Sequence, residues 1–561
     1  MLIQKLQLLL CLLPSLLFGN KAESYINNQE VIVQRVKGFI ISGESYAPPD
    51  YIIKTTNGVL FYRVRPPEDM SVQTLFCNSL EKRIIGRPLT FKDVQEYKQD
   101  IADYYLKKCH IHVAVTLPEQ DCTNGVVVVK VSESKVGEVT VTGNYWFSKE
   151  QYLKYITLGH NDILNSDELI AGVNRINNSP WRKAEIVYKA GRNPLETDIE
   201  LVVEDKKPIN FYAGADNTGF RITEYTRLYI GFNWGNIFDI DQSLAFNYST
   251  SPDFSGYQSF SLEYSAPLPN DDSLRFWGGY SRIQPEDVSL PIVLTVGQSW
   301  QLSGRYDLHL PQSLKMHQNI NFGLDYKSTN NDFIVNELNI SSLPVTIFQL
   351  AVDYKGGLKF DEHQISGVAS MFAQPWQIGD TMSNAAYSAL RPNSNPLYFI
   401  LRGFAKYTYQ EDNNDAFAAK VRLQGQVSSD ALIPIEQFGL GGIDSVRGYV
   451  DREVNADNAF ILNFDVRTPK VSLFQYINQK YRKWDKLCGV AFFDVANGWI
   501  YHPQVNQPAY YFLAGIGPGI RYDIANNLYA RFDLGIRLGD VPFDATYDSR
   551  VRFYFNLIAT Y

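Results

Sequence analysis

The side chain with the clearest chemical potential is an arginine in a glycine-rich turn, Arg447 in the stretch Leu440–Tyr449 (LGGIDSVRGY). Gly441 and Gly442 give the backbone access to positive φ angles, and Gly448 allows the chain to reverse directly after the arginine. A guanidinium binds a carboxylate through two parallel hydrogen bonds, so such a turn can fix a loop at a defined place. An ordinary surface hairpin is the expectation if the stretch stands alone.

Residues with catalytic or metal-binding potential are scattered along the rest of the chain. His110 and His112 share one strand face, but no Cys or acidic cluster completes a metal site. The run Gly515–Gly519 (GIGPG) imitates part of a dinucleotide-binding loop, yet it lies in a predicted strand and contains a proline. No Ser-His-Asp or nucleophile-elbow pattern stands out. We therefore predict no enzyme activity, no cofactor and no metal.

Length and composition favour a membrane barrel with further domains. With 561 residues the chain is too long for one ordinary core. Aromatic residues make up 14% of it, including 36 Tyr and 33 Phe, and charged residues make up 20%. Such a mixture suits strands with one face in lipid and the other in a wet lumen. The net charge of -8 argues against a general nucleic-acid binder.

The first 22 residues indicate a secretory signal peptide, in which Lys5 precedes an apolar run and small or polar residues follow. Beyond residue 22 no uninterrupted apolar run approaches the roughly 18 residues of a membrane helix. A membrane-spanning form must therefore use strands closed into a barrel. Among Cys77, Cys109 and Cys122 one disulfide is expected in an oxidising compartment, with the pairing left open.

Two small α+β domains are predicted ahead of the barrel, at residues 30–132 and 133–207. In the first, helical spacing over Phe91–Lys107 precedes two strands, and Tyr51–Met70 is interpreted as an inserted hairpin. Domains of this kind leave a strand edge and a helix–strand groove open, to which an extended client can add by main-chain hydrogen bonds. The alternative is that both domains are spacers.

At Pro208 the sequence pattern changes from mixed helix and strand signals to a series of strand signals. From residue 208 to residue 561 about sixteen stretches show period-two alternation, separated by turn clusters. Such alternation places one side-chain face toward lipid and the other toward a polar interior. We predict a transmembrane antiparallel β-barrel of about sixteen strands. A large soluble β-sandwich would alternate too.

The end of the chain favours the barrel over the sandwich. The last stretch, Val551–Tyr561, is amphipathic, with Phe553 and Phe555 on the same face as the terminal Tyr561. A terminal aromatic residue that closes such a strand resembles the recognition signal of outer-membrane barrels. That resemblance implies periplasmic chaperones and the barrel assembly machinery as partners during biogenesis.

The run Gln437–Gly442 (QFGLGG), followed by Ser445–Tyr449 (SVRGY), resembles the signature of the outer-membrane transporters of two-partner secretion. That hemolysin-activator-like (TpsB) family pairs periplasmic polypeptide-transport-associated (POTRA) domains with a C-terminal barrel. The resemblance implies that the arginine lies on a long extracellular loop, residues 428–457, folded back into the barrel. It also implies that the arginine pairs with an acid of the inner wall, here Asp494. The family usually has Gly two residues after this acid, where this chain has Ala496.

The resemblance implies a transporter in a bacterial-type outer membrane, surrounded by outer-membrane lipid, with its POTRA domains in the periplasm. It would capture an unfolded exoprotein, large and β-helical, and pass it outward through the barrel without ATP. The pair Arg447 and Asp494 would then serve architecture or gating. Asp465 and Arg467, on the inward face of the adjoining strand, would complete the network.

Other functions remain open at this point. A barrel assembly factor would share the POTRA domains and the V-R-G-Y loop, although two POTRA domains favour secretion. A passive porin or a receptor for host molecules would not need periplasmic domains. One family element, a plug helix before the first POTRA domain, is not evident. Only about Glu23–Glu30 is available for it, so we expect it to be absent or very short.

Overall fold

The computed structural model describes residues 30–64, 70–193, 195–219, 224–268, 272–283, 294–310, 315–335, 338–340, 344–411, 416–504, 507–525, 527–539 and 549–561. The predicted signal peptide and residues 23–29, where a plug helix would begin, lie outside these ranges. The chain forms two compact units, Met1–Lys206 and Lys207–Tyr561. Among the described residues no helix combines the length and the apolar character needed to cross a membrane.

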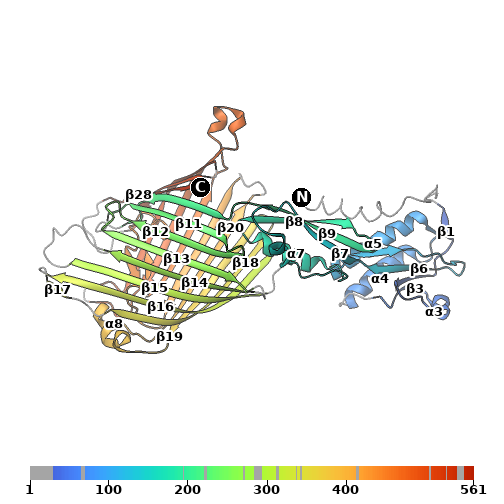
Figure 1. The fold of residues 1–561 in the computed structure, drawn as a ribbon, viewed down its shortest axis with the longest axis horizontal. Helices are drawn as coiled ribbons and strands as arrows, with labels where there is room; N and C mark the ends of the chain where they lie inside the picture. Colours follow the sequence, from blue (N-terminus) through green and yellow to red (C-terminus); the bar gives the residue numbers. More distant parts are fainter. Residues whose placement is uncertain are drawn as a thin grey trace. The chain divides into compact units, whose positions relative to one another are not determined.

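The first unit begins with a domain built on a four-stranded sheet (Figure 1). Its elements are β1 (Val31–Val33), β2 (Gly38–Gly43), α3 (Asp50–Thr55), β3 (Gly58–Tyr62), α4 (Met70–Ile84), β4 (Leu89–Thr90), α5 (Phe91–Cys109), β5 (Val113–Thr116) and β6 (Val126–Glu133). The strand order is β3-β2-β6-β5, with β2 parallel to both neighbours and β5 antiparallel to β6. Strands β1 and β4 pair separately.

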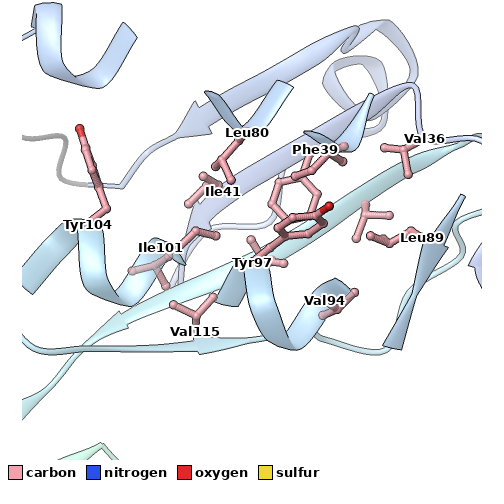
Figure 2. Packing of buried hydrophobic residues seen from close by; sticks show 14 of the residues in the cluster. Val36, Phe39, Ile41, Leu80, Leu89, Val94, Tyr97, Ile101, Tyr104 and Val115 are labelled. Carbon is pink, nitrogen blue, oxygen red and sulfur yellow. The ribbon is translucent and has the colours of Figure 1, made fainter. Parts of the chain in front are cut away.

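Helix α5 shows how the sequence builds this core. Thr90 and Asp93 form a capping box, in which each side chain accepts the other residue's backbone N–H. Apolar side chains at helical spacing then face the sheet, as Figure 2 shows for Tyr97 beside Phe39 of β2 and for Ile101 on the side of Ile41. The helix predicted over Phe91–Lys107 is thus present, with two more residues at its C-terminal end.

The interpretation of Tyr51–Met70 as an inserted hairpin is wrong. Residues Asp50–Thr55 form a short helix, and Gly58–Tyr62 form a strand that joins β2 in parallel. The physical reason lies in β2 and β6, whose near-continuous apolar runs need cover on both sheet faces. Ile52 and Ile53 of α3 supply that cover on the face opposite α4 and α5.

The expected disulfide is also wrong for this structure. Cys77 and Cys122 are both free thiols, and every pairing considered uses one of them. Burial raises the pKa of both thiols above the ordinary value, which makes them less reactive. Cys488 of the barrel is a free thiol too, and it is buried.

The second domain is a three-stranded sheet covered by two helices. Its elements are β7 (Lys135–Thr142), α6 (Lys149–Leu153), α7 (Ser166–Asn177), β8 (Arg182–Ala190) and β9 (Glu196–Asp205). The strand order is β7-β9-β8, with β7 parallel and β8 antiparallel to β9. Leu169 and Ile176 of α7 pack with Ile199 and Leu201 of β9 in the core.

His112 joins the two domains rather than forming part of a metal site. Its Nε2 lies 2.8 Å from the hydroxyl of Ser166, its ring packs against Tyr188, and its backbone N–H donates to Leu164. Burial lowers the pKa of this imidazole. Among the described residues no group of three or more His, Cys, Asp or Glu side chains could hold a metal ion.

The second unit is a closed barrel of sixteen antiparallel strands (Figure 1). They are β10 (Ile209–Asp216), β11 (Arg227–Ile237), β12 (Gln242–Thr250), β13 (Tyr257–Pro267), β14 (Ser273–Ile283), β15 (Leu294–His309), β16 (Met316–Val335), β18 (Val345–Phe360), β19 (His363–Gln374), β20 (Tyr398–Gln410), β21 (Ala418–Ser428), β24 (Asn458–Arg467), β25 (Asp485–Trp499), β26 (Tyr510–Ile524), β27 (Leu528–Arg537) and β28 (Val551–Thr560). The short β17 (Leu338–Ile340) pairs with the end of β16. Strand β10 pairs with β28 and closes the barrel.

The predicted alternation matches the two faces of the barrel wall. On β24 the exposed Phe460 and Phe464 alternate with the buried Asn463 and Asp465. An exposed apolar row suits contact with lipid, and a buried polar row suits the lumen. The predicted fold class is therefore confirmed.

The segment between β21 and β24, residues 429–457, is folded into the barrel. It carries a two-stranded ladder of β22 (Phe438–Leu440) and β23 (Val454–Ala456). Its buried side chains, among them Val446 and Tyr449, pack against residues of β24, β25 and β26. A separate connection, between β19 and β20, contains a short helix, α8 (Asn384–Leu390).

Candidate functional site

Arg447 reaches the inner wall of the barrel and binds Asp494 of β25. Its Nε and Nη2 donate to the two carboxylate oxygens at 2.7 Å each, and its backbone N–H donates to Oδ2 at 3.1 Å. The arginine is 1% exposed and the aspartate 0%. Two parallel bonds fix the direction of the guanidinium as well as its place. The family resemblance had pointed to this acid, and the structure brings the two side chains together although Ala496 replaces the usual glycine.

Further wall residues surround the arginine, and Asp533 of β27 lies 3.8 Å from its Nη1. Asp465 of β24 accepts from Nη2 at 2.7 Å. Asn463, also on β24, donates to Asp494 at 2.8 Å and so holds the carboxylate in place. The guanidinium carbon lies 3.5 Å from the centre of the Phe492 ring, a cation–π contact. Arg467, expected to take part, has no hydrogen bond or ion pair with Arg447 or Asp494 among the described contacts.

Glycines in the wall make room for the loop tip. A Cβ atom on Gly515 of β26 would lie 1.9 Å from the carbonyl oxygen of Arg447. A Cβ on Gly535 of β27 would lie 2.3 Å from the amide nitrogen of Gly448. Gly448 itself has a φ of 112°, which L side chains rarely adopt. The GIGPG run is thus part of the barrel wall, and its first glycine, Gly515, leaves the space into which the V-R-G-Y tip packs.

The other predicted loop residues shape the turn before the arginine. Gly441 and Gly442 have φ angles of 102° and 101°. The amide of Gly441 donates to the hydroxyl of Ser445 at 3.1 Å, which closes the turn. Tyr449 is 1% exposed and packs in the cluster that joins the loop to the wall. All six predicted loop-to-wall residues therefore lie in one connected region.

Sequence reasoning missed Tyr554, which holds the tip from the last strand. Its hydroxyl accepts the N–H of Gly448 and donates to the carbonyl of Tyr449. Tyr554 is 2% exposed. Because Tyr554 alternates with the outward-facing Phe553 and Phe555, the sequence could have predicted that it faces the lumen. Nothing in the sequence indicated that its hydroxyl would bind the loop tip.

Two additional ion pairs anchor the loop at other parts of the barrel. Glu436, fully buried, accepts from Lys327 of β16 at 2.5 Å. Asp457 accepts two bonds, of 2.6 and 2.9 Å, from Arg391, which follows α8. Because a buried carboxylate without a partner is costly, these pairs hold both ends of the loop in the lumen. None of these four residues was predicted.

The predicted C-terminal signal residues lie on the outer face. Phe553 is 50% exposed and stacks on Phe532 of β27, with ring centres 5.9 Å apart. Tyr561 is 92% exposed, and its backbone N–H and carbonyl both bond to Phe211 at the barrel seam. Phe555 shares their face and is part of the same row of rings.

A closed barrel, two small α+β domains ahead of it and an arginine-tipped loop in the lumen define an outer-membrane transporter of the two-partner secretion class. The family model described as haemolysin secretion/activation protein ShlB/FhaC/HecB matches residues 196–522, and the ShlB-type POTRA domain model matches residues 75–134. The chain belongs to this ShlB/FhaC/HecB family. The family consists of transporters rather than enzymes.

Curated relatives and solved structures agree with this assignment. The heme/hemopexin transporter protein HuxB of Haemophilus influenzae (strain 86-028NP) is 20% identical over 408 residues, which cover 69% of this chain and 68% of HuxB. The outer membrane transporter CdiB of Dickeya dadantii (strain 3937) is 22% identical, over 66% of this chain and 64% of CdiB. The solved structure of CdiB from Escherichia coli has a TM-score of 0.72 at 16% identity and covers 97% of this chain and 93% of that one. The last comparison shows a shared fold.

Proposed function

We propose that the loop 429–457 is the gate of this transporter and that Arg447 is its latch. The observation that carries the proposal is the buried bidentate pair between Arg447 and Asp494, at the tip of a loop that lies in the lumen. An exoprotein cannot share the lumen with the loop, so the pair must break or move during transport. A charge-assisted pair within a polar lumen can re-form after each passage.

The client is an unfolded exoprotein that the POTRA domains capture as an added strand. In the second domain both β7 and β8 are edge strands. Near the start of β7 the N–H of Val136 already donates to Asp162 and its carbonyl accepts from Asn161. Near the start of β8 the side-chain amide of Asn177 binds the N–H and the carbonyl of Ala184. The part of β8 after Ala184 is therefore the better site for a client strand. A large β-helical client suits this mode because its own strands are extended.

Folding of the client outside the cell supplies the direction of transport. Because one relative is named a heme/hemopexin transporter, the client class includes proteins that act on heme or hemopexin. Deletion of residues 31–205 tests the dedicated role. Loss of one or a few large secreted proteins, with other outer-membrane barrels unaffected, is expected. A general fall in many barrels would instead identify an assembly factor.

Replacement of Arg447 by alanine tests the latch. We expect lower secretion together with faster proteolysis of the loop in intact cells, at an unchanged amount of folded barrel. Asp444→Asn is the matched control, because Asp444 lies on the same tip but its side chain is 73% exposed in its pair with Arg531. Unchanged secretion and unchanged loop protection in Arg447→Ala would refute the proposal.

A further inference from the structure

The connection between β24 and β25, residues 468–484, is unusual for its end of the barrel. Strand β10 starts directly after the periplasmic domains, so its first residue lies at the periplasmic end, and the antiparallel order places this connection there too. The other periplasmic connections lie at 238–241, 268–272, 310–315, 361–362, 411–417 and 525–527, each less than half as long. Barrels of this type normally keep their periplasmic turns short.

The segment 468–484 is folded and tied to the barrel. Asp485, 1% exposed, accepts the backbone N–H groups of Leu473 and Phe474 and the hydroxyls of Ser472 and Tyr522. Two short 3-10 turns follow, at Phe474–Tyr476 and Gln479–Tyr481. Such a network fixes the surface that the segment presents.

That surface combines exposed apolar side chains with positive charge. The exposed fractions are 42% for Leu473, 80% for Tyr476, 76% for Ile477 and 55% for Trp484. The cations within the segment are Lys470, Lys480, Arg482 and Lys483. No Asp or Glu lies between residues 468 and 484. Aromatic and aliphatic side chains next to Lys and Arg are the mixture found where proteins meet lipid headgroups.

The segment also lies where a membrane surface would be. Val471 pairs with Leu487 of β25. On β25 the even-numbered side chains, Asp494 among them, face the lumen, so Leu487 belongs to the row that faces lipid. Residues paired across a ladder share a face, so the side chain of Val471 lies on the lipid-facing side of the wall. In Figure 1 the segment, in orange near the C-terminus, projects to one side of the barrel. The carbonyl of Trp484 accepts from Ala525, which ties its base to the neighbouring periplasmic turn.

We propose that residues 468–484 form an interfacial anchor that inserts Tyr476, Ile477 and Trp484 into the periplasmic leaflet and binds anionic phospholipid headgroups through Lys480, Arg482 and Lys483. The apolar side chains gain by leaving water, and the three exposed cations gain from the negative surface of the leaflet. The anchor connects β24, which carries Asp465, to β25, which carries Asp494. It holds this part of the barrel at a fixed depth and tilt in the membrane. A client protein is the competing occupant of the same surface, and the test separates the two.

The test uses the full chain in lipid nanodiscs with an environment-sensitive fluorophore on Ile477→Cys. Wild-type protein labelled in parallel gives the background from native cysteines. Lipids brominated on the acyl chains should quench the probe by about twofold or more, and discs with phosphatidylglycerol should quench it more strongly than discs of phosphatidylcholine alone. Heat-modifiable migration in gels verifies that each variant retains a closed barrel.

Two triple variants separate specific headgroup binding from general charge. K480E/R482E/K483E should lose the effect of phosphatidylglycerol. The matched control, K207E/K315E/K359E, reverses three exposed lysines elsewhere in the barrel unit and should keep it. Absence of quenching in both lipid compositions would overturn the anchor. Equal quenching in both compositions would overturn the headgroup assignment, and protection of the probe only on addition of unfolded client would assign the surface to the client.

Discussion

The hydroxyl of Tyr554 accepts the amide N–H of Gly448 at 2.8 Å, and so links the last barrel strand to the tip of the inward-folded loop. Tyr554→Phe removes this bond and the one donated to Tyr449, and leaves a buried N–H without its partner. We expect a local cost of about 1–3 kcal/mol. Hydrogen exchange should be faster over residues 445–450 while the barrel amides keep their protection. Tyr510→Phe, at a half-exposed position on β26, should leave the exchange over the loop unchanged.

The pair Arg447 and Asp494 should behave as a coupled unit. Each single alanine variant leaves a buried charge without its main partner, and we expect a loss of about 3–5 kcal/mol in the free energy of unfolding. The double variant should lose less than the sum of the two, because neither charge remains. Urea unfolding of the four proteins in detergent measures this coupling. Additive losses would show that the two side chains act independently.

Gly515 should not tolerate a methyl group. In Gly515→Ala the new Cβ would meet the carbonyl oxygen of Arg447, so the loop tip must move off the wall. We expect a destabilisation of about 1–3 kcal/mol or more and greater protease sensitivity of the loop. Gly403→Ala is the matched control, because a Cβ at that strand position on β20 meets nothing within 4 Å. Equal behaviour of the two variants would mean that the tip is not seated as described.

Acid should loosen the junction of the two periplasmic domains. Burial lowers the pKa of His112 below its unfolded value of about 6.5, so the unfolded state binds more protons at acidic pH. The stabilisation is therefore complete above about pH 6.5 and declines as the pH falls below it. Hydrogen exchange near residues 110–112 and 164–166, corrected for intrinsic rates, should quicken between pH 7.5 and pH 5.5. His112→Gln should reduce this pH dependence, whereas His110→Gln, at an exposed position, should retain it.

Local pattern was enough to predict the barrel and much of its wall. The alternation predicted over residues 208–561 is visible on β24, where exposed Phe460 and Phe464 alternate with buried Asn463 and Asp465. The helix predicted over Phe91–Lys107 begins at a capping box whose two residues are only three positions apart in sequence. The strand Gly58–Tyr62 was misinterpreted because its partner in the sheet is a parallel strand. Parallel pairing needs a crossover and leaves no turn pattern to read.

The candidate site divides in the same way. Arg447 and Asp494 could be named because the residues around the arginine resemble a family motif. Lys327 and Arg391 could not, since many polar side chains alternate into the lumen and only the path of the loop decides which ones it meets. Gly515 was singled out only because the GIGPG run imitates a dinucleotide-binding loop. Its function depends on a carbonyl oxygen that is 68 positions away in the sequence.

The ion pairs made by Glu436, Arg447 and Asp457 of the loop give the barrel a mechanical property. Glu436 is held by β16, Asp457 by the residue after α8, and Arg447 by β24 and β25, so one segment spans separate sectors of the wall. The loop is therefore a cross-brace that resists flattening of the cylinder. Its withdrawal would free the lumen and soften the wall in the same step, so a passing chain would meet a wider and more compliant conduit than the resting one.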